Sequence, residues 1–219
     1  MPSRLSRRFE LAHTRLEIAG RSYDLLRPRN VDELISEEDF AIDERIPYWA
    51  DCWPSARILA GRLGSERGAG RRLLELGCGI GLVSLVAAQA GFEVLATDYY
   101  ADALEFTAAN AERNSLRGVD TRLVDWRTLP EDLGTFDVVV ASDVLYEAPH
   151  AGLVAEALVR SLNDAGLGLV SDPGRRTAPT FVDECAQRGL EARCVLREPT
   201  VDAGASLTVS IFEVRRLGC

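Results

Sequence analysis

The stretch RLLELGCGIG, residues 72–81, decides the fold of this chain. Its first half, residues 72–76, is a short apolar run that is typical of a buried β-strand, and three alternating glycines follow at once. Glycine lets the backbone turn tightly and come close to a ligand. We expect a helix over about 81–90, so the glycines lie at the carboxyl end of a strand, where open parallel sheets bind their ligands.

The same alternation of strand and helix continues through most of the remaining sequence. We expect parallel strands at 72–76, 92–97, 119–124, 136–142 and 166–171. We expect helices at about 81–90, 101–114, 150–163 and 178–189. Unbroken alternation of this kind predicts an α/β fold with a parallel sheet that is covered by helices on both faces. Three consecutive valines at 138–140 fit a strand that is buried on both sides.

The two last apolar runs, 191–197 and 206–215, are separated only by a loop. Since the loop is too short for a crossover helix, these strands should pair antiparallel. The sequence therefore predicts a doubly wound, mostly parallel seven-stranded sheet with an antiparallel edge hairpin.

Residues 1–45 precede this pattern, and we expect them to be an N-terminal extension of a single domain that spans 46–219. Within the extension, 15–27 predicts a β-hairpin about Ala19-Gly20, and the acidic stretch 31–45 predicts a linker with a helical turn.

Composition excludes several classes of function. The 219 residues include 25 Arg, no Lys and 34 acidic residues, which gives a net charge of −9 and disfavours a nucleic-acid binder. Five widely spaced cysteines and two histidines form neither a disulfide framework nor a metal site. No apolar run is long enough to span a membrane, and no secretory signal is apparent. We therefore expect a cytoplasmic protein.

The glycine spacing separates two kinds of nucleotide ligand. A dinucleotide fingerprint needs G-x-G-x-x-G, but the sixth position counted from Gly77 is Leu82. The glycines instead run G-x-G-x-G. Asp98 follows the second predicted strand, 21 residues after Gly77, where an acid accepts two hydrogen bonds from ribose hydroxyls in such folds.

The segment 75–81 resembles motif I of the class I S-adenosylmethionine (SAM) methyltransferases, which reads E/D-x-G-x-G-x-G. The resemblance implies a Rossmann-like methyltransferase fold and SAM as cofactor, with S-adenosylhomocysteine as product. It implies that Asp98 binds the ribose and that Tyr99 lies beside the adenine. It also implies that Asp125 accepts a hydrogen bond from the adenine amino group and that Trp126 packs against the adenine ring. The other implied cofactor-binding residues are Glu75, Gly77, Cys78, Gly79, Gly81 and Ser142.

The fourth strand is followed by Asp143-Val-Leu-Tyr146. Prolines are absent at 144 and 145, which excludes the D-P-P-Y/F signature of methyltransferases that act on adenine or glutamine. The motif resembles the D/E-x-x-Y of the family 16 protein lysine methyltransferases. Residues 49–54, which include Trp53, resemble the Trp-Pro segment that covers the cofactor in that family, and 169–174 resembles the end of the fifth strand in its bacterial branch. If a helical turn follows the strand, Asp143 and Tyr146 lie on one side of it.

The resemblance, which spans about 46–216, implies methyl transfer to a lysine amine of a protein substrate, with Asp143 and Tyr146 as the catalytic residues. Asp143 would orient the amine, and Tyr146 would narrow the pocket and offer an aromatic face to the cation. Two alternatives stay open: a small-molecule amine or hydroxyl as acceptor, and a SAM-binding partner subunit without turnover. An NAD-dependent oxidoreductase is more distant, because the third glycine is misplaced. The oligomeric state is not predicted.

Overall fold

The structure is a computed structural model that describes residues 4–30, 34 and 47–218. The helices are α1 (Arg4–Arg8), η2 (Tyr48–Ala50), α3 (Pro54–Gly64), α4 (Leu82–Gln89), α5 (Ala101–Arg113), η3 (Trp126–Thr128), η4 (Glu131–Leu133), α6 (His150–Ser161) and α7 (Ala178–Gln187). The strands are β1 (Leu11–Ile18), β2 (Arg21–Pro28), β3 (Arg72–Leu76), β4 (Glu93–Asp98), β5 (Val119–Leu123), β6 (Phe136–Ser142), β7 (Leu162–Asp172), β8 (Leu190–Asp202) and β9 (Ala205–Arg216).

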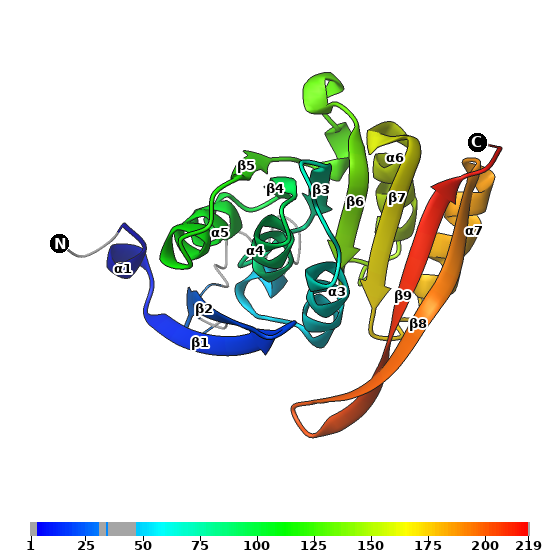
Figure 1. The fold of residues 1–219 in the computed structure, drawn as a ribbon. Coiled ribbons are helices and arrows are strands. Elements are labelled where there is room, and N and C mark those ends of the chain that lie inside the picture. The colour runs from blue at the N-terminus through cyan, green and yellow to red at the C-terminus, as the bar shows by residue number, and fades with distance from the viewer. Residues whose placement is uncertain (1–3, 31–33, 35–46, 219) are drawn as a thin grey trace.

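Seven strands form one twisted sheet in the order β5-β4-β3-β6-β7-β9-β8 (Figure 1). The first five strands of this order run parallel, and β9 runs antiparallel to both β7 and β8. The order reverses direction between β3 and β6, so the carboxyl ends of these two strands flank a topological switch point. The predicted fold class is confirmed.

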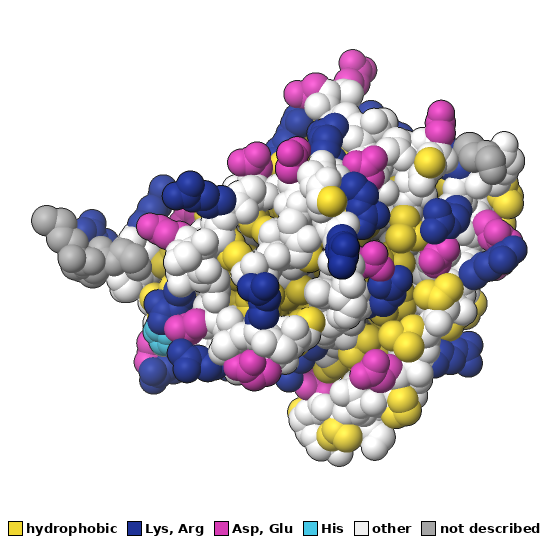
Figure 2. All heavy atoms as spheres, in the orientation of Figure 1, with side chains coloured by type: hydrophobic (Ala, Val, Ile, Leu, Met, Phe, Trp, Pro, Cys, Tyr) yellow, Lys and Arg dark blue, Asp and Glu magenta, His cyan; other side chains and the backbone are white. Residues whose placement is uncertain are grey.

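Helices cover both faces of the sheet. Because side chains alternate along a strand, Leu73 and Val138 pack on α3, α4 and α5, whereas Leu74 and Val139 pack on α6 and α7. On the face shown in Figure 2, arginine and acidic side chains are mixed rather than segregated. One of the exposed ion pairs joins Arg8 and Asp102 at 2.5 Å.

The antiparallel hairpin is longer than the sequence predicts. The prediction of a loop after residue 197 is wrong. Instead, β8 and β9 stay paired up to a two-residue turn at Ala203 and Gly204, both of which have positive φ. That geometry matches the right-handed twist of paired strands. Pro199 is tolerated because β8 is the edge strand. Beyond the carboxyl end of β7 the two strands continue as a projecting ribbon (Figure 1).

The predicted N-terminal hairpin is present as β1 and β2, with its turn at Ala19-Gly20. It packs against α5, where the Asn110 side chain accepts a hydrogen bond from Leu26 N at 2.7 Å and donates one to Leu26 O at 3.0 Å. The predicted linker over 31–45 lies outside the described residues, except for Leu34. The division of the chain at residue 45 stays a prediction.

Candidate active site

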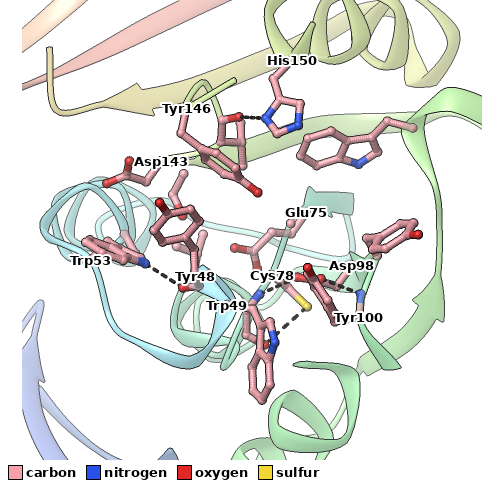
Figure 3. Close-up of a pocket in the computed structure, with 18 of the residues that line it drawn as sticks. Tyr48, Trp49, Trp53, Glu75, Cys78, Asp98, Tyr100, Asp143, Tyr146 and His150 are labelled. Carbon is pink, nitrogen blue, oxygen red and sulfur yellow. Dashed lines mark hydrogen bonds between the residues drawn. The ribbon is translucent and has the colours of Figure 1, made fainter. Parts of the chain in front are cut away.

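A cavity of about 290 Å³ opens at the carboxyl ends of β3, β4 and β6 (Figure 3). It brings together twelve of the thirteen residues that the sequence singles out: Trp53, Glu75, Gly77, Cys78, Gly79, Asp98, Tyr99, Asp125, Trp126, Ser142, Asp143 and Tyr146. These residues come from five separate segments of the chain, so their meeting at one cavity depends on the strand order. Gly81 does not line the cavity.

Backbone conformation and close packing both favour glycine at the three glycine positions of the loop between β3 and α4. All three glycines have positive φ, in the region that disfavours other residues. A Cβ atom on Gly79 would lie 2.9 Å from the carbonyl oxygen of Trp49, and one on Gly81 would lie 2.7 Å from Thr107 Oγ1. Gly81 therefore lets the start of α4 pack against α5, and its contribution to the cavity is indirect.

Asp98 holds the glycine loop from the end of β4. Its Oδ2 accepts a hydrogen bond from Gly79 N at 2.9 Å, and its Oδ1 accepts one from Tyr100 N at 2.9 Å. The residue is only 5% exposed. Burial raises the pKa of Asp98 to about 6, although the two backbone N–H groups act in the opposite direction.

A second buried acid lies at the end of β3. Glu75 is 1% exposed and accepts a hydrogen bond from the Ser84 hydroxyl at 2.5 Å. Burial raises the pKa of Glu75 to about 8, and the nearby Asp98 carboxylate adds to the shift. Burial, and after it the charges of Asp98 and Glu75, raise the pKa of the Cys78 thiol well above its usual range. This end of the cavity is therefore suited to a ligand with positive charge, which would favour ionised carboxylates.

We expect the free energy of unfolding of the cofactor-free chain to fall as the pH rises from about 4 to about 8. Asp98 and Glu75 have unfolded pKa values near 4, so in this window the folded chain binds more protons than the unfolded chain. The stability that protonation gives is complete below about pH 4. It is lost as the pH passes about 6 for Asp98 and about 8 for Glu75.

Urea unfolding at several pH values measures this dependence, with Glu75→Gln as the control. An amide cannot ionise, so the variant should lose the slope between about pH 6 and about pH 8. Equal slopes for the wild-type chain and the variant would contradict the assignment.

The segment after β5 also lines the cavity. The Asp125 carboxylate accepts hydrogen bonds from Arg127 Nε at 2.9 Å and from Arg127 Nη2 at 2.8 Å. The Arg127 guanidinium lies 5.3 Å from the centre of the Tyr99 ring. The indole N–H of Trp126 is buried and has no hydrogen-bond partner among the described residues. An unpartnered buried donor at a cavity wall fits a ligand that brings an acceptor atom.

The loop after β6 differs from the expected helical turn. Residues 144–146 are not helical, and Asp143 has φ 58°. Two tertiary contacts hold the loop instead: His150 Nδ1 lies 2.8 Å from Val144 O, and Thr177 Oγ1 donates to Leu145 O. The Asp143 carboxylate is bound by Arg175 and Ser55, which are described further below.

Aromatic residues that are not predicted from the sequence also line the cavity. The ring of Tyr48 lies 5.0 Å from that of Tyr146 and 6.0 Å from that of Trp53, between centroids. The His150 ring meets the edge of Tyr146 at 4.7 Å (Figure 3). Tyr48 directly precedes the Trp-Pro segment, which is the one sequence signal that could have indicated it.

Among the described residues, no group of three or more His, Cys, Asp or Glu side chains is placed to hold a metal ion. Over the same part of the chain, no helix has the length and apolar character needed to cross a membrane.

Comparison with known proteins identifies the family of this chain. The family described as "Methyltransferase domain" matches residues 68–200, which hold the glycine loop, Asp98 and Asp143. The chain belongs to this methyltransferase family. The membership of the SAM methyltransferases that the glycine loop indicates is therefore confirmed.

The methyltransferase is 33% identical over 133 residues to the electron transfer flavoprotein beta subunit lysine methyltransferase of Xenopus laevis, which covers 59% of this chain and 53% of that protein. It is 35% identical over 157 residues to the calmodulin-lysine N-methyltransferase of Arabidopsis thaliana, covering 64% and 50% of the two chains. The chain spans about half the length of these curated relatives.

A solved structure with the same fold is the ribosomal protein L11 methylase of Lactobacillus delbrueckii subsp. bulgaricus. Its TM-score is 0.56 at 20% identity, over 74% of this chain and 76% of that chain. This likeness supports the Rossmann-like fold of the methyltransferase.

Proposed function

We propose that this methyltransferase transfers a methyl group from SAM to the side-chain amine of a lysine in a protein substrate. The observation that carries the proposal is the meeting of the glycine loop, Asp98 and the D-x-x-Y segment at one cavity. The relatives named as lysine methyltransferases support the acceptor class.

The residues at the cavity fit SAM. Asp98 would accept hydrogen bonds from the ribose hydroxyls. The loop of Gly77, Cys78 and Gly79 would lie along the ribose and the methionine part, because its two glycines let the main chain come close to a ligand. Glu75 faces the end of the cavity suited to a cation. Tyr99, Asp125, Trp126, Ser142 and Trp53 would complete the cofactor site. The buried donor on Trp126 would find a partner on the ligand.

When bound, SAM supplies an electrophilic methyl carbon on a positively charged sulfur. Methyl transfer would form a bond between the amine nitrogen and that carbon, and the electron pair of the broken carbon–sulfur bond would stay on sulfur in S-adenosylhomocysteine. The methylated amine then loses a proton to solvent. The protein mainly aligns the reactants, which can supply about 7–11 kcal/mol.

The acceptor amine must first be neutral. A lysine has a reference pKa of about 10.4, so deprotonation at neutral pH requires roughly 4 kcal/mol. We propose that Tyr146, whose ring lines the cavity beside Tyr48, narrows the acceptor pocket. Asp143 is proposed as an orienting residue, since a carboxylate near the amine would raise the amine's pKa and is unsuited to act as its base.

The two alternative functions that the sequence leaves open predict different outcomes when the protein is given SAM with a labelled methyl group. A small-molecule acceptor would leave proteins unlabelled, and a partner subunit without turnover would bind SAM and label nothing.

We also propose that the protein is cytoplasmic, because its described cysteines, of which three are buried, are all free thiols.

Incubating the purified protein and methyl-labelled SAM with cell lysate tests the proposal. We expect label on protein, on a lysine located by mass spectrometry, and no transfer by a variant that cannot bind SAM. Purified electron transfer flavoprotein beta subunit is the first single acceptor to test, because relatives are named for it. Label found only in the small-molecule fraction would overturn the lysine assignment.

A further inference from the structure

The Asp143 carboxylate is already bound within the chain. Its Oδ1 accepts hydrogen bonds from Arg175 Nε at 2.8 Å and Arg175 Nη2 at 2.5 Å. Its Oδ2 accepts one from the Ser55 hydroxyl at 3.1 Å, at the start of α3. The Asp143 side chain is 4% exposed and that of Arg175 is 32% exposed. A buried carboxylate is thus held by a cation that reaches solvent.

Arg175 is fixed in place by the end of β7. Its backbone N–H donates to Asp172 Oδ1 at 2.7 Å, and the N–H of Gly174 donates to the same oxygen at 2.8 Å. The guanidinium carbon lies 5.7 Å from the centre of the Tyr146 ring, which lines the cavity. Arg175 itself does not line the cavity. Its charge therefore acts on the acceptor side of the site without direct contact with the proposed cofactor position.

We propose that Arg175 is a positioning residue that neutralises Asp143 and so keeps the acceptor amine in its uncharged, nucleophilic form. This inference rests on the proposed function. A lone Asp143 carboxylate would stabilise a protonated amine and slow the reaction, as explained above. Paired with Arg175, the carboxylate can fix the loop and align the acceptor while adding little net charge to the pocket.

The other charged or titratable groups around the pair come from three segments. Glu147 and His150, whose ring lies 3.5 Å from the Glu147 carboxylate, border the cavity from the loop and α6. Asp172 lies behind Arg175 at the end of β7, and Tyr146 lies beside it. From α3 the pair meets the neutral Ser55. All these groups are retained in the variants below, so differences between variants report on the pair.

The pH dependence of kcat for methyl transfer to the labelled acceptor protein tests the inference, because its rising limb reports deprotonation in the bound complex. Arg175→Met should move this limb to higher pH by about half a unit to one unit. Asp143→Asn leaves Arg175 unopposed and should move the limb to lower pH. The double variant removes both charges, and Arg175→Lys keeps the charge. For both, the limb should stay close to that of the wild-type protein.

If Asp143 instead acts on the amine alone and Arg175 is only structural, Asp143→Asn would still shift the limb to lower pH, and the double variant would keep that shift instead of reversing it. A limb in Arg175→Met that stays in place or moves to lower pH overturns the inference. If Arg175→Met does not fold, an acid shift in Asp143→Asn together with reversal in the double variant decides the question.

A readout without activity separates this inference from the proposed function. Arg175→Met leaves the buried Asp143 carboxylate without its cation, so it should lower the melting temperature by about 6–12 °C, and the double variant should lower it by less than the sum of the two single substitutions. SAM affinity of Arg175→Met, measured by calorimetry, should stay within about twofold of wild type, since Arg175 is outside the cavity. Additive melting shifts would overturn the pairing, whereas a wild-type protein that labels no lysine overturns only the proposed function.

Discussion

Replacing Asp98 with alanine should weaken SAM binding by about 100-fold to 10,000-fold. Hydrogen bonds from ribose hydroxyls to a buried carboxylate are charge-assisted, and each contributes about 1.5–3 kcal/mol. The same carboxylate holds Gly79 N and Tyr100 N, so the substitution also loosens the loop that approaches the ligand. Isothermal titration calorimetry with SAM measures the change.

Two further measurements separate charge from packing. Asp120→Ala removes an exposed carboxylate from the neighbouring strand β5 and should leave the affinity unchanged. Asp98→Asn keeps the size of the side chain and should still lose most of the affinity. For the wild-type protein, affinity should decline below about pH 6, where Asp98 becomes protonated and accepts less well. Unchanged affinity in Asp98→Ala would refute the ribose assignment.

Replacing Asn110 with alanine should lower the free energy of unfolding by about 3–5 kcal/mol, a melting shift of about 6–15 °C. This fully buried side chain on α5 makes three hydrogen bonds with the main chain. It accepts one from Leu26 N and donates one each to Leu26 O and Ile80 O, at 2.7, 3.0 and 2.8 Å. Alanine leaves all three backbone groups without this partner.

Ile80 belongs to the glycine loop, so the loss of Asn110 should also weaken SAM binding. Glu112→Ala, at an exposed position of the same helix, is the control and should change the stability by less than about 0.5 kcal/mol. Chemical denaturation of both variants makes the comparison. A loss below about 1 kcal/mol in Asn110→Ala would show that the three hydrogen bonds are replaced by others.

The sheet and the cofactor end of the site could be predicted because their signals are local. The glycine loop and Asp98 each follow directly from a strand, and parallel strands carry their ends to one edge. The Asp143–Arg175 pair could not be predicted in this way. Arg175 is 32 residues further along the chain, and the contact depends on β7 lying next to β6.

The loop after Asp143 shows a second limit of the sequence. The spacing of Asp143 and Tyr146 is compatible with a helical turn. In the structure, however, His150 and Thr177 contact the backbone carbonyls of residues 144 and 145, and the segment is not helical. Tertiary hydrogen bonds of this kind override local preference. Tyr48 escapes prediction for a related reason, since it lies in η2 and its ring meets Tyr146 from a distant part of the chain.

The tie between the first hairpin and Asn110 also bears on the order of events during synthesis. A hairpin alone in water is marginally stable, and the partner of Leu26 lies 84 residues downstream. At about 5–20 residues per second, the ribosome needs roughly 4–17 s to make that interval. The β1–β2 hairpin must therefore wait for α5 before it is stably packed, and until then its apolar side chains are open to chaperones.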